Sequence, residues 1–423
     1  MKALFPCLVA AALMALAAGP VSAEGFKAAA AKRMITPDPL LPVSGGMGTP
    51  KPTTEKRGDL WVRAFVFERE GTRVALVSVD NLGWPAYWGD KTRALVPDIP
   101  PENIVIGATH THSAPDAYGF PDLEGKIAAD TKYLEWVCVQ AADAVKEALK
   151  NLQPASLKIA VGEAKGKIAY NYYAPELYDP RCSVLQAVAQ DGTAIATLVN
   201  YAIHPEVLGS DKGIMSPDLC GPLYDRIASS GGGMGMFMNS AQGGMVTADN
   251  RAPGGDQEIW EECVRIGELL ADEALRIVAD APVQDAPGLS CAFRNIQLTV
   301  SSPLMQVVLL NSPMAANMPD VNAVPARINL VNIGSAQLLT IPGEALPNIG
   351  YYLKRHMKTP HTFLLGLTND AFGYMLTKYD FDSFKRYEYI SETSLGEMVG
   401  EEYIKEALGL VEETPGPDAA PAN

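Results

Sequence analysis

The sequence predicts an α/β fold in which mixed β-sheets are flanked by helices within a single large domain. Short apolar runs typical of buried strands alternate with amphipathic stretches typical of helices along most of the chain. The 423 residues are 48% hydrophobic and 20% charged, a composition typical of a globular protein with a large core. We find no internal repeat and no long polar linker that would divide the chain.

The individual elements follow from the same patterns. Strands are expected at short apolar runs, several of them bounded by turn residues, over 63–67, 74–79, 104–108, 157–160, 194–200, 234–238, 297–300, 328–331, 336–341 and 362–367. Helices are expected where Ala, Leu, Glu and Lys recur at amphipathic spacing, over 122–151, 218–230, 256–280 and 347–357. The Pro- and Ala-rich segment 412–423 is expected to be a disordered tail.

The first 23 residues predict a secretory signal peptide. Lys2 supplies a positive charge, residues 3–19 are almost wholly apolar, and Val21-Ser22-Ala23 fits a small-residue cleavage site. The apolar run is short and ends in Gly19-Pro20, which argues against a transmembrane anchor. We therefore expect a periplasmic or secreted protein without a membrane-spanning segment.

Charge and cysteine content exclude some classes of function. The formal net charge of −15 argues against a nucleic-acid partner, because phosphate backbones select basic surfaces. No Cys-x-x-Cys spacing occurs, so a thiolate metal site is not expected. Five cysteines lie beyond the signal peptide: Cys138, Cys182, Cys220, Cys263 and Cys291. Most of them are expected to be small buried hydrophobic residues, with one or two disulfides as the alternative.

Four junctions between a predicted strand and the following loop carry polar residues suited to metal chemistry. They are Thr109-His110-Thr111-His112, Tyr201-Ala202-Ile203-His204-Pro205, Ile341-Pro342-Gly343-Glu344 and Asn369-Asp370-Ala371-Phe372-Gly373-Tyr374. Imidazole is the commonest neutral metal ligand, and Zn²⁺ accepts nitrogen and oxygen ligands in a near-tetrahedral set. Two histidines, one glutamate and one tyrosine would supply such a set. Each motif alone also has a structural interpretation, as a hydrogen-bonded histidine, a turn or a packed ring.

Together these four segments resemble the neutral/alkaline, non-lysosomal ceramidase family, in which they occur in the same order. The segments Gly58–Val66, Ser78-Val79-Asp80 and Tyr379–Glu388 are similar too, so the resemblance covers about residues 27–400. It implies a ceramidase-like catalytic domain over residues 24–411, between the signal peptide and the tail. It also implies that this domain is a zinc-dependent amidohydrolase, with Zn²⁺ as its cofactor.

The resemblance assigns roles to particular residues. The zinc ligands of the family fall on His110, His204, Glu344 and Tyr374. His112 falls on a second active-site histidine that does not bind the metal directly, and it would act as general acid or base or stabilise an oxyanion. Asp80 matches a polar position near the site and is a further candidate catalytic residue.

The chain departs from the family at the active-site serine. In the family this serine lies in a Gly-Asp-x-Ser-Pro-Asn segment, and an ungapped match places Val246 there. Thr247 is the candidate catalytic replacement after a small shift, with Asp249 as the alternative. The preceding Gln242, Gly243 and Gly244 are expected to bind substrate as a backbone anion pocket, with a flexible glycine turn as the alternative interpretation.

The expected function is therefore that of a secreted zinc hydrolase, in which a metal-activated water attacks the amide bond of a ceramide-like or other N-acylated small molecule, including lipids. Two alternatives stay open. The same centre could serve an esterase or lactonase, and the loss of the serine could mark a non-catalytic binding protein. The presence of all four candidate ligands argues against the second alternative.

Overall fold

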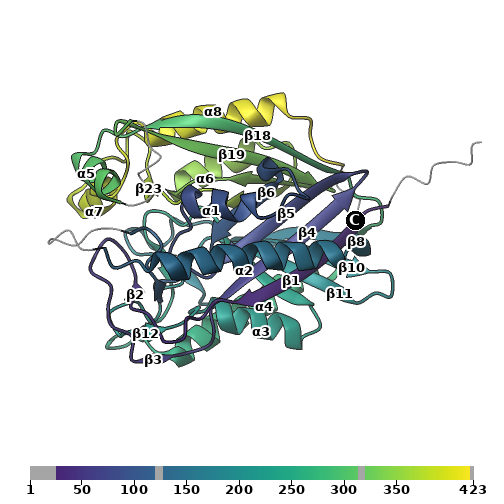
Figure 1. The fold of residues 1–423 in the computed structure, drawn as a ribbon, viewed down its shortest axis with the longest axis horizontal. Coiled ribbons are helices and arrows are strands. Elements are labelled where there is room, and N and C mark those ends of the chain that lie inside the picture. Colours follow the sequence, from purple (N-terminus) through teal and green to yellow (C-terminus); the bar gives the residue numbers. More distant parts are fainter. Residues whose placement is uncertain (1–24, 120–126, 313–319, 420–423) are drawn as a thin grey trace, which may run out of the picture.

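Two β-sheets packed face to face form the centre of the computed structural model, which describes residues 25–119, 127–312 and 320–419 (Figure 1). Helices cover both outer faces, so the layers follow the order helices, large sheet, small sheet, helices. The predicted α/β class with mixed sheets and flanking helices is confirmed.

The large sheet has nine strands and mixes parallel and antiparallel pairs. Its order is β13-β11-β10-β8-β1-β4-β5-β6, with β17 paired to β8. Only the β11/β13 and β5/β6 pairs in it are parallel. The bounds are β13 Met234–Asn239, β11 Ala194–Tyr201, β10 Arg181–Ala189, β8 Gln153–Glu163, β1 Lys27–Met34, β4 Trp61–Arg69, β5 Thr72–Val79, β6 Ile104–Ala108 and β17 Val283–Gln284.

The small sheet has four strands in the order β18-β19-β20-β22, and its last pair is parallel. These strands are β18 Leu289–Thr299, β19 Ala323–Ile333, β20 Ala336–Thr340 and β22 His361–Leu365. Short two-stranded pairs connect the loops around them: β2 Val43–Ser44 with β7 Ala114–Pro115, β3 Glu55–Lys56 with β12 Ile214–Met215, β9 Ala169–Asn171 with β14 Val246–Ala248, β15 Arg251–Ala252 with β16 Gly255–Asp256, and β21 Glu344–Ala345 with β23 Tyr374–Met375.

The helices divide between the two outer faces. Helices α2 (Thr131–Lys150), α3 (Cys220–Ser229) and α4 (Trp260–Ala279) pack on the large sheet, and α6 (Pro347–His356) and α8 (Val399–Glu413) pack on the small sheet. Figure 1 shows α8 along the top of the molecule and α2 across its middle, with α3 and α4 below it. The remaining helices are short: α1 Ala86–Ala94, α5 Pro303–Asn311 and α7 Glu388–Glu392.

The large sheet is buried on both faces, and successive side chains of a strand point alternately into the cores on its two sides. In β5, Ala75, Val77 and Val79 pack in the core beneath α2, whereas Val74 and Leu76 pack against the small sheet. A strand covered on both faces needs apolar residues at consecutive positions rather than at every second one. This explains why the strand runs in the sequence are continuously apolar.

The large sheet curls, so that strands from its two ends meet. Although β13 lies at one end of the strand order and β5 near the other, the Ser78 hydroxyl of β5 donates to the Phe237 carbonyl of β13 over 2.6 Å. The Arg63 guanidinium of β4 likewise donates to the Gly235 carbonyl over 2.9 Å. The curl brings the carboxyl ends of β6 and β11 together, where the histidine motifs begin.

Polar contacts also fix the small sheet to this edge. The buried Asn200 amide nitrogen of β11 lies 2.9 Å from the Met238 carbonyl, 3.0 Å from the Asn239 carbonyl and 2.7 Å from the Leu364 carbonyl of β22. Beyond β22, the Asn369 backbone N–H donates to the Ile106 carbonyl over 2.7 Å. The carboxyl ends of β6, β11, β20 and β22 therefore share one edge of the two-sheet stack.

Several sequence-based boundaries differ from the structure. The helix expected over 122–151 begins at Thr131, because the Asp130 carboxylate caps it by accepting from the Lys132 and Tyr133 N–H groups. Of the expected tail, Glu412 and Glu413 belong to α8, and Asp418 bonds to the backbone of Gly288 and Gly334. The expected helical residues 122–126 and the tail residues 420–423 lie outside the described residues.

The signal peptide predicted over residues 1–23 also lies outside the described residues and stays a prediction. Among the helices that the structure describes, none combines the length and apolar character needed to cross a bilayer.

Replacing Asn200 by alanine tests the link between the sheets. The Asn200→Ala variant loses the amide that serves three buried carbonyls, so its free energy of unfolding should fall by about 2–3 kcal/mol. Urea denaturation measures this difference. The matched control is Gln297→Ala at an exposed position of β18, which should change stability by less than about 0.5 kcal/mol. Equal stability of both variants would show that the amide does not join the sheets.

Candidate metal centre

One ring nitrogen of His110 forms a hydrogen bond with a backbone carbonyl, and the other faces Glu344. It follows β6 in the left-handed region, with φ of 74°. Its Nδ1 lies 2.6 Å from the Leu82 carbonyl oxygen. A carbonyl can only accept a hydrogen bond, so Nδ1 carries the proton and a neutral His110 ring keeps its lone pair on Nε2.

His204 is held in the same manner after β11. Its Nδ1 lies 2.8 Å from the Val246 carbonyl oxygen, which also accepts the His204 backbone N–H over 2.8 Å. Val246 is the residue that the ungapped sequence match sets at the serine position of the resembling family. Its backbone thus orients a histidine, and this role needs no hydroxyl.

The two inward nitrogens converge on one carboxylate oxygen. Glu344 Oε2 lies 3.1 Å from His204 Nε2 and 3.5 Å from His110 Nε2, and all three side chains are buried. Histidine ligands of metals usually donate their other ring nitrogen to a carbonyl or carboxylate, as both rings do here. Two nitrogens and one carboxylate oxygen form a donor set that fits Zn²⁺. The residues therefore suit a divalent metal ion.

In the protein alone, these groups form a buried ion pair. Burial lowers the pKa of His204, but the carboxylates of Glu206 and Glu344 outweigh burial and raise it to about 9. Burial raises the pKa of Glu344, but His110 and His204 together move it well below its usual range. The centre thus holds an ionised carboxylate beside a protonated imidazole, whose proton a metal ion has to displace.

His112 joins the same cluster. Its Nε2 lies 3.3 Å from His110 Nε2, and its ring centroid lies 5.7 Å from that of His204. Ligand nitrogens of the three histidines all lie within 4.8 Å of one another, so this group could also hold a metal. Burial and the charges of the other two histidines together lower the pKa of His112 to about 3, although Glu206 opposes this shift.

Tyr374 lies beside Glu344, because β21 and β23 pair in parallel with these two residues in register. Its hydroxyl donates to Met245 Sδ over 3.1 Å. Burial, together with the nearby Glu344 carboxylate, raises the pKa of this phenol well above its usual value. The structure thus places all four predicted ligands at one edge of the fold and brings three of them into direct contact.

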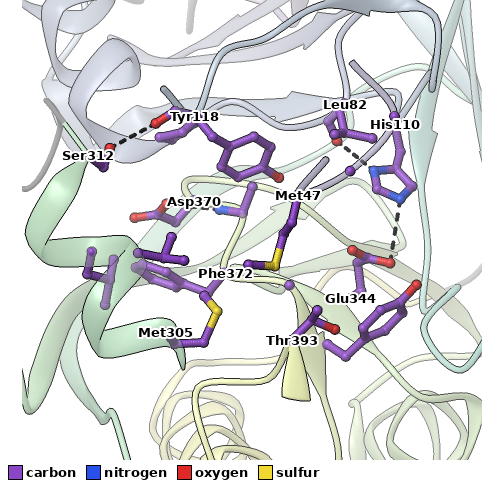
Figure 2. Close-up of a pocket in the computed structure, with 18 of the residues that line it drawn as sticks. Met47, Leu82, His110, Tyr118, Met305, Ser312, Glu344, Asp370, Phe372 and Thr393 are labelled. Carbon is purple, nitrogen blue, oxygen red and sulfur yellow. Dashed lines mark hydrogen bonds and ion pairs between the residues drawn. The ribbon is translucent and has the colours of Figure 1, made fainter. Parts of the chain in front are cut away.

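A largely apolar pocket opens beside this cluster. In the view of Figure 2, His110 and Glu344 lie at one side of the pocket, and Asp370, Tyr118 and Ser312 lie at the other. Its apolar lining comes mainly from the β22–β23 loop, α5 and the β2 region: Met47, Leu82, Pro85, Met305, Val308, Leu309, Ala371 and Phe372. The arrangement places the cluster of His110 and Glu344 at one side of a largely apolar cavity suited to an apolar ligand.

Asp80 does not contribute to this pocket. Its carboxylate accepts from the Trp61 N–H over 2.9 Å and from the Tyr224 hydroxyl over 3.0 Å. Burial raises its pKa to about 6, although Arg63 opposes the shift. These contacts place Asp80 in the polar packing between β4, β5 and α3, and it is not among the residues that line the pocket.

The segment Gln242–Gly244 packs against the backbone of Glu344 and Ala345. The Gly243 N–H donates to the Ala345 carbonyl over 2.9 Å, so it is not available to an anion. The Gln242 side chain is buried and, among the described residues, its amide has no hydrogen-bond partner. None of the three residues lines this pocket, so the backbone anion pocket expected from sequence stays a prediction.

Thr247 is set back from the cavity as well. It forms a parallel bridge with His204 in the backbone, and its side chain helps to lower the pKa of Glu206. Glu206 was not predicted as a site residue, although its position two residues after His204 was a usable signal. Asp370 and the α5 residues were also missed, although the run Leu304–Leu310 is almost wholly apolar.

Comparison with known proteins identifies the fold. No protein-family model and no curated protein sequence matches this chain. Among solved structures, neutral ceramidase from Pseudomonas aeruginosa aligns with a TM-score of 0.75 at 17% identity, covering 94% of this chain and 76% of that one. A ceramidase complexed with C2 aligns with a TM-score of 0.76 at 18% identity, covering 94% and 77%. The chain therefore has the ceramidase fold, as predicted.

Gly243 offers a test of how the Glu344 strand is held. A Cβ atom at this position would overlap the Glu344 carbonyl oxygen. The Gly243→Ala variant should therefore displace Glu344 and weaken zinc binding at least about tenfold. Gly48→Ala is the control, because a Cβ there meets no atom of the described residues within 4 Å. Titration with a zinc-sensitive dye compares the two, and equal affinities would contradict the placement of Glu344 in the centre.

Zinc binding should release a proton below about pH 9. The raised pKa of His204 means that this imidazole is protonated at neutral pH, and the metal must displace that proton. Zinc affinity is therefore expected to increase as the pH rises towards 9. Calorimetry at pH 7 in two buffers of different ionisation enthalpy should report about one proton released per zinc bound. A buffer-independent heat would mean that His204 is not a ligand.

Proposed function

We propose that the protein is a zinc-dependent hydrolase that cleaves the amide bond of an N-acylated substrate with an apolar acyl chain. The observation that carries this proposal is the convergence of two anchored imidazoles on the Glu344 carboxylate at the end of an apolar pocket. The shared fold supports it, because both solved structures compared above are ceramidases.

His110, His204 and Glu344 would hold the metal, with Tyr374 as the proposed fourth ligand. The register of Tyr374 with Glu344 and the presence of both in the pocket lining support this last assignment. A bound zinc ion would supply Lewis acidity, which activates a water and polarises the carbonyl of the substrate. The Leu82 and Val246 carbonyls keep the two imidazoles in the orientation that binding requires.

His112 is the proposed general base and later general acid. It lines the pocket beside His110, and its lowered pKa keeps the ring neutral at neutral pH, as a base requires. The leaving amine needs a proton, and the same Nε2 can return the one that it received. Asp80 and Thr247 do not line the pocket, and we assign them supporting roles.

The pocket would bind the acyl chain of the substrate. The lining includes methionine, leucine, valine and phenylalanine side chains, and each buried methylene of a ligand contributes about 0.8 kcal/mol. The Asp370 carboxyl lies within this lining, and burial raises its pKa to about 7. A single polar group in an apolar pocket can orient one polar substituent of a ligand.

Metal content and turnover test the proposal together. Wild-type protein should hold one zinc per chain and hydrolyse a long N-acyl amide faster than a short one. His204→Ala should lose the metal and lower kcat/KM by more than about 1,000-fold, because both activation and positioning depend on it. A matched pair of amide and ester with the same acyl chain identifies the bond cleaved. Zinc binding without amide cleavage would contradict the proposed reaction, and an absence of zinc would contradict the centre itself.

A further inference from the structure

We propose that Glu206 is a positioning residue that fixes the tautomer and orientation of the His112 ring. Glu206 Oε2 lies 3.5 Å from His112 Nδ1, and both side chains are largely buried. The carboxylate approaches the ring on the side opposite to Nε2, which faces His110 Nε2 at 3.3 Å. The effect proposed here for hydrolysis rests on the proposed function, whereas the contact itself does not.

The chain around Glu206 holds it in this place. The Pro205 carbonyl accepts the His112 backbone N–H over 3.1 Å, so the two loops are joined beside the ring. The Glu206 N–H donates to the His204 carbonyl over 3.0 Å, which folds the segment back on itself. The three residues 204–206 thus supply an inward imidazole, a backbone acceptor for His112 and a carboxylate for its ring.

Thr247 completes the arrangement. Its backbone pairs with His204, which places its side chain beside Glu206, whose pKa it helps to lower. The contacts therefore run from Thr247 through Glu206 and His112 to the metal centre. Thr247 was expected from sequence to be catalytic, and here it acts two contacts away from the reacting atoms by orienting Glu206.

The chemical consequence follows from the two forms of a neutral imidazole. A neutral ring carries its proton on Nδ1 or on Nε2, and only the first form leaves the lone pair of Nε2 facing the centre. A carboxylate near Nδ1 attracts the proton of the Nδ1–H form and repels the lone pair of the other form. Glu206 should therefore hold His112 ready to accept a proton at Nε2, as the aspartate does for histidine in a catalytic triad.

Histidine ring NMR tests the proposal without metal or substrate. The chain has only five histidines, so ¹⁵N-histidine labelling gives a resolvable set of rings, and a His112→Asn variant assigns the relevant signals. Wild-type protein, metal-free or zinc-loaded, should show His112 protonated on Nδ1. Glu206→Ala should move part or all of that proton to Nε2, while His110 and His204 keep theirs on Nδ1 through their carbonyl partners.

A pair of milder variants keeps the test open if Glu206→Ala fails to fold. Thr247→Val removes the hydroxyl beside Glu206 and should cause a smaller tautomer shift, whereas Thr247→Ser keeps the hydroxyl and should match the wild type. Glu176→Ala removes an exposed loop carboxylate and should leave every ring signal unchanged. His112 on Nε2 in the wild type, or on Nδ1 in Glu206→Ala, would overturn the proposal.

Kinetics then separate this inference from the proposed function. On an N-acyl amide at saturating zinc, Glu206→Ala should lower kcat about 10- to 100-fold and leave KM largely unchanged. A tautomer shift without any hydrolysis by the wild type would refute the proposed function and leave the positioning role intact. A normal kcat in a variant whose tautomer has shifted would show that the ring orientation does not serve catalysis, and would overturn that part of the proposal.

Discussion

The Glu344 carboxylate is the contact on which the centre of this molecule depends. It extends from a loop of the small sheet, whereas the two imidazoles that it meets follow strands of the large sheet. An ionised carboxylate buried away from water is stable only when opposite charge or a metal compensates it. The packing of the two sheets and the chemistry of the centre therefore support each other. Separation of the sheets at this edge would expose the carboxylate and remove it from the two histidines.

Backbone carbonyls and close backbone packing, more than side chains, give the centre its order. Leu82 and Val246 orient the two imidazoles through their carbonyl groups, and Gly243 packs against the Glu344 backbone. A role carried by the backbone places little restriction on residue type, provided that the chain keeps its path. The expected replacement of the family's serine by Val246 would therefore leave the His204 ring held by the same carbonyl. The ceramidase fold is compatible with such a change, since sites are grafted on folds and vary on them.

The pocket connects the centre to substrate choice. Its apolar lining is assembled from the β2 region, α5 and the β22–β23 loop, so residues more than 300 positions apart line one cavity. Polar groups occupy one end, at His110 and Glu344, and a single buried carboxyl, Asp370, lies at the other side in Figure 2. A ligand with one reactive polar group and a long apolar part complements this distribution. The same distribution would serve a charged or very polar substrate poorly, because burial of such groups without partners is unfavourable.

By itself, the sequence determined the α/β class, most of the strands, and the four junctions where His110, His204, Glu344 and Tyr374 follow apolar runs. These features depend on neighbours along the chain, since periodicity and turn residues act over a few positions. Only the tertiary structure decided which residues meet. His204 and Glu344 are 140 residues apart, and the curl of the large sheet and its packing on the small one bring them together. The same packing turned Asp80 and Gln242 away from the pocket and placed Glu206 against His112, because contacts between distant segments depend on how whole sheets pack, which local pattern does not encode.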